Sequence, residues 1–175
     1  MSEAHRRLAG IGGLDPVPYE WLHLTTLVVS LTDEVTEEQI TVLIAEARKR
    51  LADVQPATVT LGRVLYHPEA IAVEARPAEA LEPMLDAVRA ATRAAVGHDG
   101  VLGTDPWIPH VTVAYSSADQ PAEPVIAALG RHLPECEVRI ESINLVSQDG
   151  PEYLWNWHPL ADVLFGAARQ KVKTD

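Results

Sequence analysis

Two apolar runs of this chain carry the same pattern, a histidine and a threonine separated by one aliphatic residue. The first is His23-Leu24-Thr25 within residues 21–29, and the second is His110-Val111-Thr112 within residues 108–115. Both runs have the β-branched and aromatic content that predicts β-strands. Because side chains alternate between the faces of a strand, each histidine should lie beside its threonine, with the aliphatic residue turned the other way.

The two pairs together supply the groups that metal-free chemistry on a phosphate ester needs. His23 and His110 can exchange protons near neutral pH, and the hydroxyls of Thr25 and Thr112 can donate hydrogen bonds to an anion. Threonine is also an ordinary strand residue. Two motifs in matching settings nevertheless favour the catalytic interpretation for both pairs.

The order of elements around the first motif returns around the second: a motif strand, a helix, a strand, a turn and a strand. For the first half the pattern predicts a helix over residues 34–53 and strands over 57–66 and 70–75. A further helix over 77–96 should end at Gly97. For the second half it predicts a helix over 121–132, a long strand over 137–148 and a last strand over 153–157.

This repetition indicates an α+β fold of two lobes. We expect duplicated β-α-β-β units with antiparallel sheets around a central cleft and helices on the outside. A length of 175 residues suits a single two-lobed domain. Its segments would be a lead-in (1–20), a motif-bearing half (21–75), a linking helix and loop (76–108), a second motif-bearing half (109–158) and a C-terminal tail (159–175).

Composition restricts the partners. A net charge of −11 argues against a protein that grips long nucleic acid, because phosphate neutralisation by basic side chains supplies most of that affinity. We therefore expect a small nucleotide or an RNA 3′ end as substrate. No apolar run approaches the roughly 20 residues that cross a bilayer, and Cys136 is the single cysteine. We expect a cytoplasmic monomer without membrane contact, metal or other cofactor.

Residues outside the motifs offer weaker candidates. Tyr115, Trp155 and Trp157 could stack on a base, in competition with core packing. Arg63 and Arg139 occupy equivalent strand positions of the two halves and could contact phosphate, although solvated arginines on an outer sheet face are the commoner case. His132 is expected near a helix C-terminus, where the helix dipole favours a cation.

With both motifs in view, the chain resembles the 2H phosphoesterase superfamily, which includes bacterial 2′-5′ RNA ligase-like proteins and cyclic nucleotide phosphodiesterases. The resemblance covers roughly residues 14 to 158 and rests on the two motifs in their settings. It implies a two-lobed fold with facing motifs, no metal, and cleavage of a 2′,3′-cyclic phosphate or a similar diester. Ligase-like members commonly carry an arginine just after the second motif, where this chain has Ala114-Tyr115-Ser116-Ser117.

We therefore expect a cyclic phosphodiesterase in which His23 and His110 are catalytic and Thr25 and Thr112 hold the phosphate. Both imidazoles must reach oxygens of one phosphate, so their ring nitrogens should lie roughly 5–8 Å apart. The residues alone leave open which histidine is the acid; the resemblance suggests His110 as base and His23 as acid. Two alternatives remain: a module that binds a nucleotide or RNA end without turnover, and a 2′-5′ RNA ligase.

Overall fold

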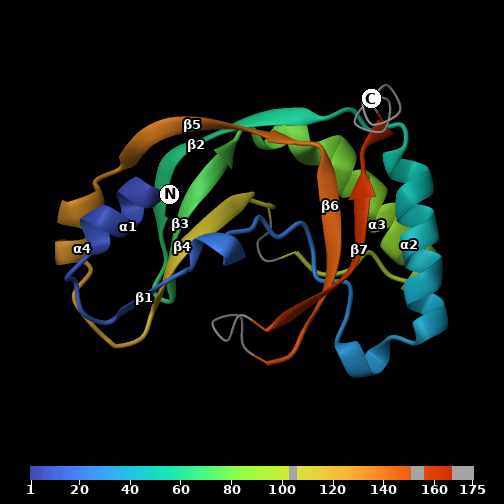
Figure 1. The fold of residues 1–175 in the computed structure, drawn as a ribbon, viewed down its shortest axis with the longest axis horizontal. Coiled ribbons are helices and arrows are strands. Elements are labelled where there is room, and N and C mark those ends of the chain that lie inside the picture. The colour runs from blue at the N-terminus through green and yellow to red at the C-terminus, as the bar shows by residue number, and fades with distance from the viewer. Residues whose placement is uncertain (103–105, 151–155, 167–175) are drawn as a thin grey trace.

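A computed structural model describes residues 1–102, 106–150 and 156–166, and its strands form two antiparallel sheets (Figure 1). The larger sheet has five strands in the order β1-β4-β3-β2-β5, and the smaller one pairs β6 with β7. The strands are β1 (Leu14–Pro16), β2 (Ala57–Tyr66), β3 (Ala70–Arg76), β4 (His110–Ser116), β5 (His132–Ile140), β6 (Ser142–Gln148) and β7 (Trp157–Leu164).

Helices cover the sheets from outside, as the sequence predicts. The α-helices are α1 (Ser2–Leu8), α2 (Glu37–Leu51), α3 (Glu82–Val96) and α4 (Glu123–Leu129). Short 3-10 helices are η1 (Tyr19–Trp21), η2 (Thr32–Glu34) and η3 (Ala78–Leu81). In Figure 1, α1 and α4 lie at one end of the molecule and α2 and α3 at the other; α1 packs on α4 and β5, and α2 on α3 and β7. The α+β prediction with antiparallel sheets is confirmed.

The two long helices form where local chemistry predicts them. The side chain of Thr36 accepts a hydrogen bond from the backbone N–H of Gln39, and the side chain of Gln39 accepts one from the N–H of Thr36, a capping box that begins α2. The buried face of α3 ends at Gly97, whose φ of 87° places it in the left-handed region that terminates helices. None of the described helices is long and apolar enough to cross a membrane.

The first motif departs from the prediction. The sequence predicts a strand over residues 21–29, but these residues form isolated antiparallel bridges only, Leu24 with Val111 and Val28 with Val101. Both edges of β4 are already in use, because β3 pairs along one edge and β1 pairs with Ala114–Ser116 on the other. Only the first residues of β4 are left to pair with the first motif. The segment is extended but contributes no strand to a sheet.

The second half contains a further correction. The run expected as one strand over residues 137–148 is divided at Glu141, because Ile140 pairs with Ala57 in the larger sheet while Ser142 pairs with Leu164 in the smaller one. The helix expected over 121–132 ends at Leu129. His132 therefore begins β5 and does not lie at a helix C-terminus.

The last strand also lies further along the chain than expected. The sequence predicts it over residues 153–157, of which 153–155 lie outside the described residues, and β7 runs from Trp157 to Leu164. Residues assigned to the tail from 159 onward thus continue the hairpin with β6. Their position reflects the pairing of Val163 with Ile143 and the burial of Val163 and Phe165 in the core.

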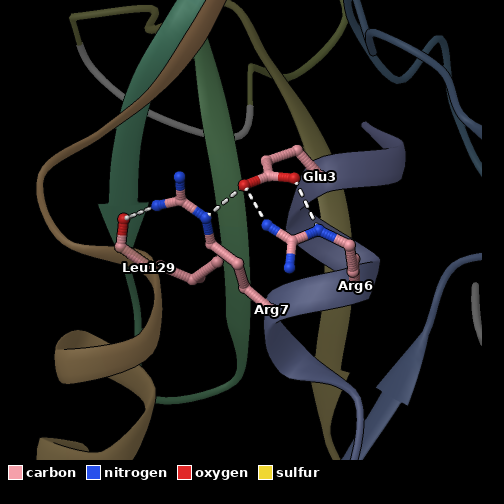
Figure 2. Close-up of polar contacts among 4 residues, drawn as sticks. All are labelled: Glu3, Arg6, Arg7 and Leu129. Carbon is pink, nitrogen blue, oxygen red and sulfur yellow. Dashed lines mark hydrogen bonds and ion pairs between the residues drawn. The ribbon is translucent and has the colours of Figure 1, made fainter.

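An ion cluster secures the N-terminal helix at the end of the molecule away from α2 (Figure 2). The carboxylate of Glu3 accepts hydrogen bonds from Nε and a terminal nitrogen of Arg6 at 2.8 and 2.6 Å, and from Nε of Arg7 at 2.7 Å. Arg7 also donates to the carbonyl oxygen of Leu129, the last residue of α4, at 3.3 Å. The hydrogen bonds from Arg6 and then Arg7 lower the pKa of Glu3 from 4.5 to about 2.

A depressed carboxyl pKa has a defined consequence for acid stability. The contribution of the ionised Glu3 side chain to the stability of the fold is fully present above pH 4.5 and is lost as the pH falls through about 2. We expect Glu3→Gln to reduce the hydrogen-exchange protection of α1 at neutral pH. The substitution should also abolish the loss of protection that the wild type shows between pH 4.5 and about 2. Exchange protection followed from neutral pH down through that range in both proteins checks this, and identical acid profiles would contradict it.

Candidate functional site

The two motifs meet through their aliphatic central residues. Leu24 and Val111 form an antiparallel bridge, and both belong to the apolar side, Val111 buried in the core and Leu24 packed against it. In an antiparallel bridge, the residue before one partner lies opposite the residue after the other partner. His23 therefore comes beside Thr112, and Thr25 beside His110, on the opposite face from the core.

The second bridge and a glycine hold the rest of the first motif segment. Val28 and Val101 exchange backbone hydrogen bonds of 2.9 and 2.8 Å. Gly100, next to Val101, has a φ of 75°, and a Cβ there would lie 2.7 Å from the carbonyl oxygen of Val28 and from Cδ1 of Leu27. A residue with a side chain would push the two segments apart. In Figure 1 this extended segment leads from η1 to η2 at one end of α2.

Both imidazoles are held in the same way by the backbone. Nδ1 of His23 lies 2.8 Å from the carbonyl oxygen of Trp21, and Nδ1 of His110 lies 2.7 Å from that of Ile108. A carbonyl oxygen can only accept, so each Nδ1 carries the proton and donates it. In the neutral ring Nε2 then has the lone pair, so Nε2 is the atom that can take up a proton.

The crosswise arrangement sets the spacing of the two rings. His23 and His110 are diagonal neighbours across the bridge, a relation that places two residues about 7–8 Å apart in antiparallel pairs, with their Cβ atoms somewhat closer. His23, His110 and Thr112 are half-buried, and Thr25 is exposed. A group the size of a phosphate can therefore reach these four side chains, called the quartet below, from solvent.

The surroundings of the two histidines differ. Trp157, at the start of β7, lies edge-to-face against His23 with ring centroids 4.2 Å apart and planes at 78°. The same indole contacts Trp21 at 5.7 Å. Among the described residues no aromatic ring contacts His110. Trp157 thus forms a wall of the His23 side, and a base stacked on it would share the indole with that imidazole.

On the other side, His110 has a charged neighbour that the sequence analysis did not single out. Glu74 of β3 is directly opposite His110 in the register, so the two side chains share a face. Its carboxylate is 2.9 Å from Nη1 of Arg63 and 4.0 Å from Nε of Arg76. The available signal was a single carboxylate within the otherwise apolar run of β3. Arg63 is thereby the candidate phosphate contact that the fold brings near the second motif.

The structure places the other candidates differently. Tyr115 lies on β4 opposite Asp15 of β1 and Ala70 of β3, and the register shift between Ile71 and Ala72 puts it on the same face as the second motif. Arg139 lies on the edge strand β5 and pairs with Glu141 at 3.1 Å. Trp155 lies outside the described residues. Within the part of the chain that the structure describes, no group of three or more His, Cys, Asp or Glu side chains could hold a metal ion.

A groove of about 1090 Å³ opens on the His23 side of the quartet. Its walls are residues 22–33 and β6, with Trp157 at one end, and Leu81, Met84 and Ile140 also contribute to its lining. His23 and Thr25 line it, whereas His110 and Thr112 do not. A phosphate between the motifs would therefore have one substituent directed into this groove.

Comparisons with known proteins identify relatives by sequence family and by fold. The family model of the 2′-5′ RNA ligase superfamily matches residues 3–152. Among solved structures, TT0787 of Thermus thermophilus is similar with a TM-score of 0.64 and 20% identity, over 94% of this chain and 89% of that one. E. coli LigT in its apo form has a TM-score of 0.64 and 17% identity, over 93% and 88%. No curated protein matches significantly.

The backbone contacts of the imidazoles predict their tautomers. At a pH where the rings are neutral, nitrogen-15 NMR should find the proton of His23 and His110 on Nδ1. His98 is the internal control, because its Nδ1 lies 3.1 Å from the N–H of Gly100 and must accept, which places its proton on Nε2. Protonation of His23 or His110 at Nε2 would contradict the proposed anchoring.

Proposed function

Because this chain belongs to the 2′-5′ RNA ligase superfamily, whose members are 2H phosphoesterases, we propose that it hydrolyses a 2′,3′-cyclic phosphate, or a related phosphodiester, of a nucleotide or RNA end. Catalysis would use two histidines and no metal ion. The observation that carries this proposal is the Leu24–Val111 bridge, which gathers two imidazoles and two hydroxyls on one face.

The reaction needs one proton to be removed and one to be supplied. One neutral imidazole takes a proton from water as its oxygen attacks phosphorus, and the other, protonated, gives a proton to the departing sugar oxygen. One P–O bond forms, one breaks, and the product is a phosphate monoester beside a free hydroxyl. Each proton transfer is typically worth about 10²–10⁴-fold in rate. The family resemblance suggests His110 as base and His23 as acid, with release of the 3′ oxygen to leave a 2′-phosphate.

The anchoring of both rings supports these roles. A carbonyl oxygen at Nδ1 holds each ring in one orientation, so Nε2 is the reactive atom in both motifs. The same carbonyl stabilises the ring when it is protonated, because its dipole faces the positive charge. Neither histidine therefore needs a carboxylate partner for orientation.

The two threonines would act on the charge that grows on the non-bridging oxygens. Their hydroxyls come from opposite motifs, beside the histidine of the other motif, so one phosphate could receive hydrogen bonds from two sides. The Arg63 guanidinium, paired with Glu74 on the His110 side, would offset the charge of that carboxylate beside the phosphate.

The first test is hydrolysis of a panel of 2′,3′-cyclic mononucleotides with EDTA present. We expect turnover by the wild type and losses of about 10²–10⁴-fold in His23→Ala and in His110→Ala. His67→Ala, in the exposed turn between β2 and β3, is the matched control and should keep wild-type activity. Turnover that requires a metal, or that survives both motif substitutions, would overturn the proposal.

The pH dependence of kcat/KM provides a second prediction. One neutral and one protonated imidazole give a bell-shaped pH profile, with one acidic and one basic limb. In His23→Ala and in His110→Ala, the profile of the residual activity should lack one of these two limbs. A flat profile in the wild type would contradict two-histidine catalysis.

The threonines give a third prediction. Removing a donor to the developing charge costs about 10²–10³-fold in kcat in comparable sites. We expect losses of that order in Thr25→Val and Thr112→Val, with the bell retained, and recovery in the corresponding serine variants, which restore the hydroxyl. Equal activity of the valine and serine variants would show that the hydroxyls do not contact the phosphate.

A further inference from the structure

The groove on the His23 side is larger than the motifs require. Its volume of about 1090 Å³ lies slightly above the usual range of small-molecule sites, about 300–1,000 Å³. Phosphate and ribose would fill a small part of it. The remainder is continuous with the catalytic quartet, because His23 and Thr25 belong to its lining.

Its walls are apolar and neutral over most of their length. Val28, Leu31 and Val146 line the groove and expose 52%, 63% and 37% of their surfaces. Exposed aliphatic side chains gathered beside a reaction centre mark a binding surface. Between them lie neutral hydrogen-bonding groups, which include Thr26, Ser30, Asn144 and Gln148.

The end of the groove away from His23 is acidic. Asp33 belongs to the lining, and the neighbouring carboxylate of Glu34 accepts a hydrogen bond of 2.7 Å from the hydroxyl of Ser30. Both acids belong to η2. The described lining residues include no lysine or arginine. A second phosphate placed here would meet carboxylates, whereas an uncharged group would meet aliphatic carbon, hydroxyls and amides.

We propose that this groove binds an uncharged, partly apolar substituent of the scissile phosphodiester, and that the substrate is a small cyclic phosphate ester and not the end of an RNA chain. The inference rests on the proposed function, since it assigns the reacting phosphate to the two motifs. An RNA chain directed along the groove would bring one further negative charge with every nucleotide. The aliphatic wall instead stabilises a substituent that carries none.

The test varies the 5′ group of one 2′,3′-cyclic nucleotide and leaves the reacting phosphate unchanged. The three compounds carry a free 5′ hydroxyl, a 5′-O-hexanoyl ester and a 5′-phosphate. We expect kcat/KM of the hexanoyl ester to exceed that of the parent by about tenfold or more, the effect of burying about two methylene groups. The 5′-phosphate should fall below the parent by about threefold at low salt.

A matched pair of variants shows whether these differences arise in the groove. Val146→Lys adds a cation to its wall, and Ile126→Lys adds the same charge to α4, where Ile126 is 45% exposed. We expect Val146→Lys to remove the advantage of the hexanoyl ester and to raise kcat/KM of the 5′-phosphate about threefold, an increase that salt suppresses. Ile126→Lys should change neither.

Each failure has its own signature. Turnover with equal kcat/KM for the three compounds, or with preference for the 5′-phosphate, overturns the inference and leaves the proposed function in place. Failure to hydrolyse any of them overturns the proposed function. In that case calorimetric affinities of the same compounds for His110→Ala decide the inference, which stands if the hexanoyl ester binds most tightly and fails otherwise.

Discussion

The antiparallel bridge between Leu24 and Val111 is the contact on which the site depends. It joins two segments far apart in the chain through their aliphatic side chains, which belong to the apolar core. Because neighbours along an extended chain point the opposite way, burying these two residues turns both histidines and both threonines outward. The antiparallel sense then sets each imidazole beside the hydroxyl of the other motif. The same hydrophobic contact therefore stabilises the fold and brings the two imidazoles and the two hydroxyls together.

The backbone orients the two imidazole rings. In each motif Nδ1 faces the carbonyl oxygen two residues earlier, at 2.8 Å for His23 and 2.7 Å for His110. A backbone anchor repeats wherever the local chain geometry repeats, which explains how two segments with different strand character hold their rings alike. Their outer surroundings then distinguish them. His23 packs against the indole of Trp157, and His110 lies opposite Glu74 with its arginines.

The charge distribution accounts for how a protein with a net charge of −11 could bind a phosphate. Hydrogen-bond donors and imidazoles act locally on one anionic group, and Arg63 lies on the His110 side. The groove on the other side offers aliphatic and neutral polar surface and ends at Asp33. Local donors can stabilise a single phosphate although the whole surface repels a polyanion. The charge distribution thus supports the proposal of a substrate with one phosphate.

The sequence by itself determined what depends on neighbours along the chain. Alternation placed each histidine beside its threonine, the Thr36 cap and Gly97 defined the ends of the long helices, and charged composition argued against a long nucleic-acid partner. Tertiary structure decided what depends on which strands pair. It limited the first motif to a single bridge with β4, divided the run over 137–148 at Glu141, and brought Trp157 and Glu74 to the histidines. The physical reason is that packing across the whole fold determines which strands pair. The alternation of side chains within one strand does not identify its partner.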